Sequence, residues 1–187
     1  MNSYIARLHR ANFLTESFNL QSCVSIGSAP RMRTMKGVVY SAEGVISSCL
    51  FCRIISREEP GNIVFENERL VAFRTIAPVT TNHLLVVPRE HRSNVHALSG
   101  KEDAMLIREM KEFAMEALRV DGCENIENSQ YSFHVPPYNS IDHLHLHAIG
   151  NRDSVTFAGA LKYAEGTFYC WSADQTIERI TKEVSKL

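Results

Sequence analysis

The stretch that decides the fold is HLHLHAI, residues 143–149. Its histidines, His143, His145 and His147, are spaced two residues apart, and the residues between them are apolar. In an extended strand successive side chains point to opposite faces, so this spacing places the imidazoles on one face and the apolar residues on the other. The pattern predicts a strand with one face in the core and three imidazoles directed at one ligand.

Three interpretations of this triplet differ in chemistry. The histidines can be half-exposed strand positions, although a solvated strand face is usually built from Thr, Lys or Glu. They can bind a metal ion as neutral imidazoles, which requires a further ligand from elsewhere in the chain. They can also act in covalent catalysis, because a neutral imidazole nitrogen is a nucleophile when a hydrogen bond to its other nitrogen fixes the tautomer.

The triplet resembles the signature of the histidine triad (HIT) proteins, in which histidines alternate with apolar residues. Further blocks resemble the family in the same order: CLFCRII at 49–55, AF at 72–73 with IAP at 76–78, and HLLVVPREH at 83–91. The approach to the triplet, FHVPPYNSID at 133–142, is similar to the Hint branch of purine nucleoside phosphoramidases, and most of all to its third type. The resemblance covers about residues 49–187.

This resemblance implies an α+β fold, an antiparallel sheet with one long helix and a short N-terminal helix. Hydrophobic spacing predicts the long helix at 102–120 and the short one at 53–57. It predicts strands at 63–66, 70–73, 83–87, 131–134 and 143–149, with an edge strand at 169–171. Ser172 and Gln175 are expected to cap a last helix, whose apolar face carries Ile177, Ile180, Val184 and Leu187.

The resemblance also assigns catalytic roles. His145 would attack the α-phosphorus of an adenosine 5′-phosphoramidate, giving a nucleotidyl-histidine and an amine, and water would then release AMP. His147 would contact a phosphate oxygen and the leaving group, and His143 would orient the array. Ser140 matches a serine that hydrogen-bonds the phosphate. The alternatives are a nucleotide-binding regulatory module without turnover, or a HIT nucleotidyl hydrolase acting on dinucleoside polyphosphates or as a deadenylase.

A purine nucleotide is therefore the expected partner. The positions that match the family's apolar slot for the base are Leu50, Phe51, Ile54, Phe73, Ile76 and Leu85. Backbone N–H groups near Asn139 and Ser140 are expected to stabilise phosphoryl charge, beside His145 and His147. Thr75 stands where the family usually has an acidic residue on the ribose hydroxyls, and a hydroxyl is a weaker acceptor than a carboxylate.

A structural zinc ion is the one metal that the sequence suggests, and the chemistry itself requires no cofactor. In some family members a Cys pair, the His of the Pro-x-x-His block and the first triad His hold zinc, and these positions are Cys49, Cys52, His91 and His143 here. They form a set suited to tetrahedral Zn²⁺. The alternative is that both cysteines are buried thiols beside the base slot.

Composition agrees with one domain at 49–187, preceded by an extension at 1–48. The chain has 187 residues, 44% of them hydrophobic, and a net charge of −1, so it has no bulk attraction for nucleic acid or anionic membrane. Before Val39 the only acidic residue is Glu16, which is typical of a disordered extension or a mitochondrial targeting segment. The five cysteines and the lack of a secretory segment favour the cytoplasm or nucleus. Homodimers are common in the Hint branch.

Overall fold

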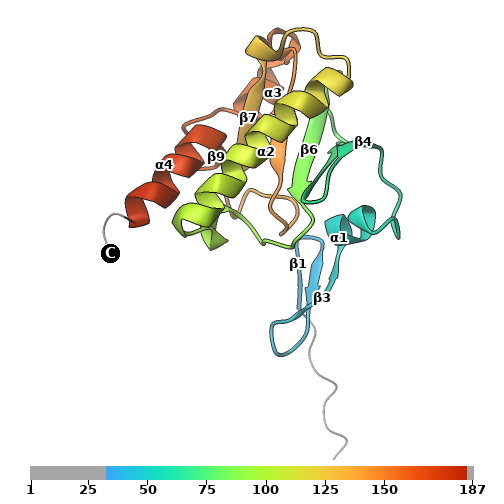
Figure 1. Ribbon diagram of the computed structural model, residues 1–187, viewed down its shortest axis with the longest axis vertical. Coiled ribbons are helices and arrows are strands. Elements are labelled where there is room, and N and C mark those ends of the chain that lie inside the picture. The colour runs from blue at the N-terminus through green and yellow to red at the C-terminus, as the bar shows by residue number, and fades with distance from the viewer. Residues whose placement is uncertain (1–32, 185–187) are drawn as a thin grey trace, which may run out of the picture.

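The computed structural model describes residues 33–184 (Figure 1). Its centre is a six-stranded antiparallel sheet in the order β4-β5-β6-β8-β7-β9. The strands are β4 (Ile63–Glu66), β5 (Leu70–Arg74), β6 (His83–Pro88), β7 (Gln130–His134), β8 (Leu146–Ile149) and β9 (Cys170–Ser172). The predicted α+β fold is confirmed, and the predicted strands at 63–66 and 70–73 are neighbours in this sheet.

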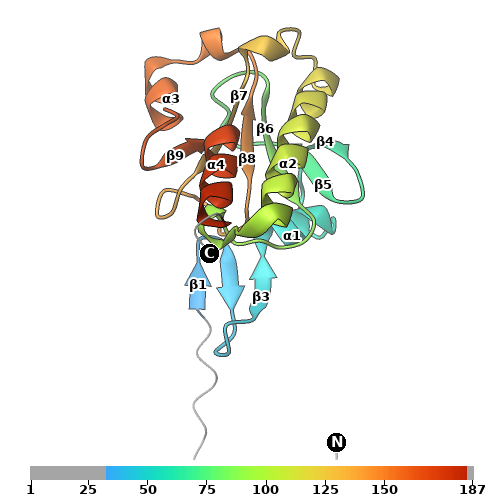
Figure 2. The same cartoon turned by 60° about the vertical axis from the view of Figure 1, so that its left-hand side comes forward.

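A smaller sheet precedes this one in the chain. It consists of β1 (Arg33–Met35), β2 (Val38–Tyr40) and β3 (Ile46–Cys49), and β3 leads directly into helix α1 (Leu50–Ile55). Figure 2 shows it below the main sheet. Within the described residues, regular structure therefore begins before Cys49, the expected start of the domain. Residues 1–32, to which the targeting or disorder prediction also applies, lie outside the described residues.

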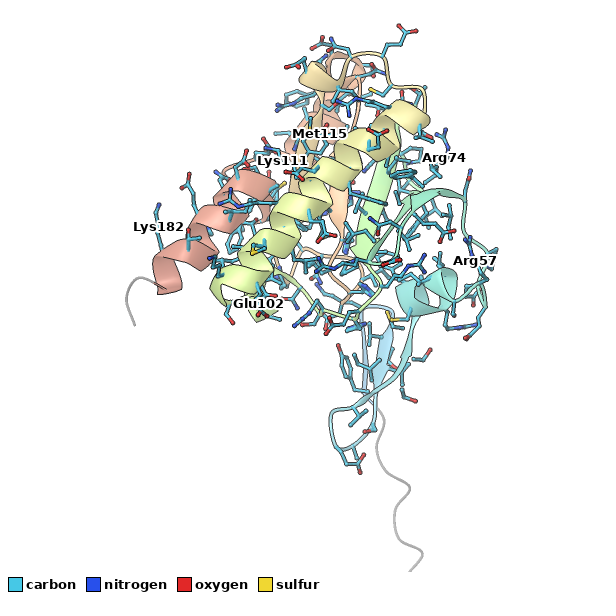
Figure 3. The ribbon with its side chains drawn as sticks, viewed as in Figure 1. Arg57, Arg74, Glu102, Lys111, Met115 and Lys182 are labelled. Atoms are coloured by element: carbon cyan, nitrogen blue, oxygen red, sulfur yellow. The ribbon has the colours of Figure 1, made fainter. Side chains whose placement is uncertain are left out.

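Two helices cover one face of the main sheet (Figure 2). Helix α2 (Gly100–Val120) buries Ile107, Met110 and Leu118 completely against the sheet, together with Leu70, Leu84 and Leu146. Helix α4 (Ala173–Val184) packs beside α2 and adds Ile177 and Ile180 to the same core. Lys111 lies on the side of α2 near α4, and its Nζ is 2.8 Å from an Asp174 carboxylate oxygen (Figure 3). In the described part of the chain no helix has the length and apolar character needed to cross a membrane.

The predicted cap of the last helix is confirmed. The Ser172 hydroxyl accepts a hydrogen bond from the backbone N–H of Gln175 at 3.1 Å, and the Gln175 amide oxygen accepts one from the N–H of Ser172 at 2.9 Å. This reciprocal pair satisfies two backbone donors at the start of α4. The remaining short elements are η1 (Val95–Ala97), η2 (Ile126–Asn128), η3 (Arg152–Ser154) and helix α3 (Phe157–Lys162).

Two predicted boundaries were wrong. Helix α1 begins at Leu50, three residues before the expected start, and ends at Ile55. Strand β8 is only Leu146–Ile149, so His143 and His145 precede it rather than lie within it. Pairing with β6 ends at Val86 and Leu146, because Pro88 has no N–H for a ladder and the N–H of Leu144 bonds the carbonyl of Arg92 instead. The alternation of faces nevertheless continues, since Leu144 and Leu146 both lie in the main core.

Glycine substitutions in the small sheet test whether its turn at Lys36–Gly37 packs against Ile141. Gly37 has φ +72°, and a Cβ there would lie 2.6 Å from Cδ1 of Ile141, whereas Gly44 has φ +81° and nothing within 4 Å of its Cβ position. We expect Gly44→Ala to lower the free energy of unfolding by about 1 kcal/mol through backbone strain. Gly37→Ala should cost about 1 kcal/mol more, since Ile141 must shift. Urea denaturation measures both, and equal losses would show that this turn does not pack on Ile141.

Candidate active site

The three histidines are buried, next to further aromatic side chains. His143, His145 and His147 expose 0%, 4% and 6% of their surface. His145 and His147 stand 5.2 Å apart between ring centroids. His147 also lies within 5.3 Å of the rings of His83 from β6, His134 from β7 and Tyr163 after α3. The sheet therefore gathers imidazoles from three adjacent strands.

One hydrogen bond determines the protonation of His145. Its Nδ1 lies 2.6 Å from the backbone carbonyl oxygen of His143, which can only accept, so Nδ1 carries the hydrogen. The lone pair of this neutral imidazole is then on Nε2. That atom is buried and has no hydrogen-bond partner among the described residues. His145 thus presents an unprotonated nitrogen held in one tautomer.

His83 holds His147 in the opposite tautomer, with the hydrogen on Nε2. The N–H of Val79 donates to Nδ1 of His83 at 3.2 Å, so the neutral ring of His83 carries its hydrogen on Nε2. His83 Nε2 lies 3.1 Å from Nδ1 of His147 and donates to it, which leaves the hydrogen of His147 on Nε2. The two neighbouring rings therefore offer a lone pair at His145 and an N–H donor at His147.

Burial keeps these rings neutral at physiological pH. It is the first cause that lowers the pKa of His145 to about 4 and that of His143 to about 3. Burial and the neighbouring histidines also lower the pKa of His147 well below its usual value. The pKa of His83 falls to about 4 through burial, followed by the charge of Lys162. A neutral imidazole is the form that can act as a nucleophile.

Four of the six predicted base-slot residues lie together beside His145. Phe51, Ile54, Phe73 and Leu85 belong to a second buried apolar cluster, separate from the core under α2. The Phe51 ring is 5.3 Å from that of Phe73 and 5.4 Å from that of His145. Such a cluster can accept one face of a purine.

The other predicted nucleotide contacts are less enclosed. Leu50 is 37% exposed and Ile76 is fully exposed, so neither packs within the buried cluster. Thr75 is half-buried at the end of β5, where its hydroxyl accepts a hydrogen bond from the N–H of Ala77 at 3.3 Å. Its hydroxyl therefore serves a local turn, a role that the sequence did not predict.

The loop before the triad is held by the small sheet. The side chain of Asn139 is buried, and its Oδ1 accepts a hydrogen bond from Nζ of Lys36 at 2.6 Å. Lys36 Nζ also donates to the carbonyl of Pro137, and its own carbonyl accepts from the N–H of Asp142 at 2.9 Å. The Tyr40 hydroxyl donates to the Asp142 carboxylate at 2.7 Å. Residues 36–40 thus fix both ends of the segment that carries Asn139.

Ser140, the predicted phosphate-binding serine, lies exposed in this loop. Its position agrees with a group that meets ligand from the solvent side, and its role stays a prediction. Sequence reasoning missed the roles of His83, His134, Tyr163 and Lys36. For His83 a signal was present: it lies two residues before Leu85 on a strand, and so faces the same side as a predicted slot residue.

The four predicted metal ligands converge. Cys49, Cys52, His91 and His143 each offer one ligand atom, and these atoms all lie within 4.8 Å of one another. Nδ1 of His143 is 3.4 Å from Sγ of Cys49 and 3.6 Å from Sγ of Cys52, and Nδ1 of His91 is 3.5 Å from Sγ of Cys52. Tetrahedral zinc with the usual bond lengths gives S···N separations of about 3.6 Å. The donor set therefore fits one Zn²⁺.

His143 is also prepared for such a role by its second nitrogen. Its Nε2 donates to the carbonyl oxygen of Pro88 at 3.0 Å, which leaves the lone pair on Nδ1, toward the sulfur atoms. A carbonyl partner on the other nitrogen is the usual arrangement for a metal-bound histidine. The ring therefore faces the cysteines, while the backbone carbonyl of the same residue serves His145.

Comparison with known families and proteins supports the family resemblance. The profile described as "Scavenger mRNA decapping enzyme C-term binding" matches residues 48–162. The chain is 33% identical to adenosine 5′-monophosphoramidase HINT3 of Xenopus tropicalis over 71% of this chain and 87% of that protein. It is 30% identical to adenosine 5′-monophosphoramidase HNT1 of Saccharomyces cerevisiae, over 80% of this chain and 84% of that protein.

A solved structure supports the fold. A HIT family hydrolase from Legionella pneumophila aligns with a TM-score of 0.51 at 30% identity, over 56% of this chain and 94% of that one. The family profile begins at residue 48, so the turn that carries Lys36 lies outside the matched residues although it holds the loop before the triad.

That contact can be tested by stability. Lys36→Met removes the ammonium group that bonds Asn139 and the carbonyl of Pro137, and we expect the free energy of unfolding to fall by about 1 kcal/mol. Lys101→Met, at an exposed position in the first turn of α2, is the matched control and should change stability by less than about 0.5 kcal/mol. Chemical denaturation compares the two variants. Equal stability of both would mean that Lys36 does not anchor the loop.

Proposed function

We infer that this chain, which belongs to the histidine triad (HIT) family, is a nucleoside phosphoramidase that hydrolyses the P–N bond of adenosine 5′-phosphoramidates. The observation that carries this inference is the pair of opposite tautomers, a lone pair on Nε2 of His145 beside an N–H on Nε2 of His147. Nucleophilic displacement with a basic leaving group needs these two functions side by side. The phosphoramidases among its relatives share this chain's family and most of its length.

In the first step, Nε2 of His145 attacks the α-phosphorus and forms a P–N bond. The bond from phosphorus to the amine breaks, and its electron pair remains on the departing nitrogen, which takes a proton from solvent water while Nε2–H of His147 donates a hydrogen bond at the reacting phosphoryl group. The nucleotidyl-imidazole keeps its hydrogen on Nδ1 and so carries positive charge. The carbonyl of His143, 2.6 Å from that nitrogen, stabilises this charge.

In the second step, water attacks the phosphorus of the nucleotidyl-His145. The P–N bond to His145 breaks as the new P–O bond forms, the proton of the attacking water passes to solvent, and Nε2–H of His147 remains a hydrogen-bond donor to the phosphoryl group. AMP leaves, and His145 is again a neutral imidazole with its lone pair on Nε2. His83 holds Nδ1 of His147 by a hydrogen bond throughout, so that the N–H of His147 stays on Nε2 and faces the reacting group.

The nucleoside is bound by apolar contact. Phe51, Phe73 and Leu85 form the wall against which the purine packs, with Phe51 in contact with the nucleophile's ring. Flat aromatic and aliphatic walls recognise a base by area rather than by a hydrogen-bond code. Because Thr75 replaces a carboxylate and its hydroxyl accepts the N–H of Ala77, the ribose hydroxyls receive no charge-assisted bond there.

A structural Zn²⁺ is the second part of this proposal. Cys49, Cys52, His91 and His143 would hold it through two thiolates and two neutral imidazoles. When bound, the ion supplies a cross-link between the start of α1, the segment after β6 and the triad, and takes no part in phosphoryl transfer. The spacing of the donor atoms and the hydrogen bond from His143 to Pro88 support this arrangement.

The nucleophile is tested by His145→Ala. Removal of the attacking nitrogen should lower AMP release from adenosine 5′-phosphoramidate by at least about 1000-fold, while AMP binding persists in the apolar slot. His96→Ala, at an exposed position outside the site, is the control and should keep nearly full turnover. Chromatography of released AMP gives the rates, with diadenosine polyphosphate assayed in parallel.

Three outcomes separate the possible functions. A His145→Ala variant that retains turnover within about tenfold of the unmodified chain contradicts the covalent mechanism. Unmodified protein that binds AMP but releases none from either substrate is a binding module instead. Faster release from diadenosine polyphosphate than from the phosphoramidate would identify a dinucleoside polyphosphate hydrolase.

Zinc is tested by metal analysis of protein purified without chelator. We expect about one Zn²⁺ per chain and a near-complete loss in Cys52→Ser, together with a lower melting temperature. Cys123→Ser changes a buried cysteine outside the cluster and should leave the metal content unaltered. A metal content near zero in the unmodified protein would show that Cys49 and Cys52 are buried thiols and not zinc ligands.

A further inference from the structure

Lys36 lies in the turn between β1 and β2, and two hydrogen bonds fix the backbone of this turn. The carbonyl of Gly37 accepts a bond from the N–H of Leu50 at 3.1 Å, and the carbonyl of Lys36 accepts one from the N–H of Asp142 at 2.9 Å. Val38, directly after the turn, is fully buried in the apolar cluster that contains the base-slot residues. The turn is therefore fixed between the start of α1 and the segment that leads into the triad.

The loop between Val135 and Asp142 carries Ser140, the serine predicted to bind the phosphate. Its side chains alternate in exposure from one residue to the next. Tyr138 is 52% exposed, Asn139 is 5% exposed, and Ser140 is exposed again. Asn139 is thus the inward anchor of the loop, and the position of the next residue follows from it.

The amide of Asn139 is hydrogen-bonded through both of its polar atoms. Nδ2 donates to the carbonyl of Ile141 at 3.2 Å, within the loop. Oδ1 accepts from Nζ of Lys36 at 2.6 Å, and the same ammonium group donates to the carbonyl of Pro137. A buried acceptor without a donor is costly, so removal of the ammonium group favours a movement of Asn139 toward solvent.

Lys36 is the only distant residue of the described chain that hydrogen-bonds residues 136–141. The other hydrogen bonds of these residues join positions no more than three apart in the sequence. Such local bonds shape the loop but do not hold it against the rest of the domain. The placement of Ser140 relative to the triad therefore depends on this lysine.

We propose that Lys36 is a positioning residue of the active site, which holds Asn139 so that the neighbouring Ser140 meets the reacting phosphoryl group. This rests on the proposed phosphoramidase function, and it adds a residue outside the part of the chain that the family profile matches. Lys36 itself touches neither the substrate nor the nucleophile. It acts through the loop, because a group that stabilises the transition state must be held in place before the reaction.

The ammonium group can also act in a second way, by attracting the anionic substrate from a distance. The two effects differ in what they change. Attraction of the substrate alters KM and is independent of Ser140, whereas positioning of the loop alters kcat and is lost when Ser140 has no hydroxyl.

The test is a double-mutant cycle on AMP release from adenosine 5′-phosphoramidate. The unmodified chain, Lys36→Met, Ser140→Ala and the variant with both changes are compared by kcat and KM. Lys36→Arg is the conservative variant, since it keeps the charge and the N–H donors. Lys101→Met is the control for loss of an exposed lysine. Thermal melting confirms that each variant is folded at the assay temperature.

Lys36→Met should lower kcat about tenfold and change KM by less than about twofold, because a displaced loop affects the transition state more than binding. Ser140→Ala should also lower kcat about tenfold, and the double variant should lie within about twofold of Ser140→Ala. Lys36→Arg should keep kcat within about threefold of the unmodified chain. Lys101→Met should match the unmodified chain.

A Lys36→Met variant that keeps kcat within about twofold overturns the proposal and leaves the phosphoramidase function in place. Full kcat in Ser140→Ala overturns it as well, as does a double variant about 100-fold below the unmodified chain, since additive effects mean that the two residues act independently. A raised KM with unchanged kcat in Lys36→Met would identify attraction of the substrate instead. Unmodified protein that releases no AMP overturns the phosphoramidase function itself, and the role of Lys36 with it.

Discussion

The hydrogen bond between Nδ1 of His145 and the carbonyl of His143 connects the fold to the chemistry, because it turns a backbone position into a choice of tautomer. The carbonyl can act in this way only if His143 itself is fixed. Its ring is held on one nitrogen by the carbonyl of Pro88 and lies against Cys49 and Cys52 on the other. Pro88 at the end of β6 therefore acts on the tautomer of His145 indirectly. It holds the ring of His143, and the backbone carbonyl of His143 holds the hydrogen on Nδ1 of His145.

His147 obtains the opposite tautomer from a different source. The N–H of Val79 and the ring of His83 form a directed series of donors that ends at Nδ1 of His147. Such a series works only among neutral rings, because a protonated imidazole donates from both nitrogens. The burial that lowers the pKa of His83 to about 4 therefore also keeps the direction of the hydrogen bonds intact at physiological pH.

The sequence predicted the parts of this site that depend on period and composition. Alternation in 143–149 identified the triad, and the family resemblance assigned Phe73 and Leu85 to one slot, where they are paired on the adjacent strands β5 and β6. The capping pair Ser172 and Gln175 could also be predicted from the sequence, because its two hydrogen bonds join residues only three positions apart. These features are local, or follow from one strand facing another.

Features that depend on distant segments could not be read in this way. Lys36 and Asn139 are 103 positions apart, and neither carries a pattern that pairs it with the other. His83 was visible only as the first residue of an apolar strand, because its partner His147 is 64 positions away. The start of β8 depends on the positions of Pro88 and Arg92 beside it. The spacing of residues within 143–149 does not contain that information.

Two buried polar atoms of the site lower the stability of the fold, and the function of the site explains why they are present. Nε2 of His145 and Nε2 of His147 are both buried without a hydrogen-bond partner among the described residues, and an unsatisfied buried polar atom costs about 1–3 kcal/mol. A phosphoryl group between the rings satisfies both atoms at once, with phosphorus at the lone pair and an oxygen or the leaving nitrogen at the N–H. The lone pair of His145 gains its bond to phosphorus only as the transition state is approached, so the free energy recovered at this atom lowers the barrier to P–N cleavage.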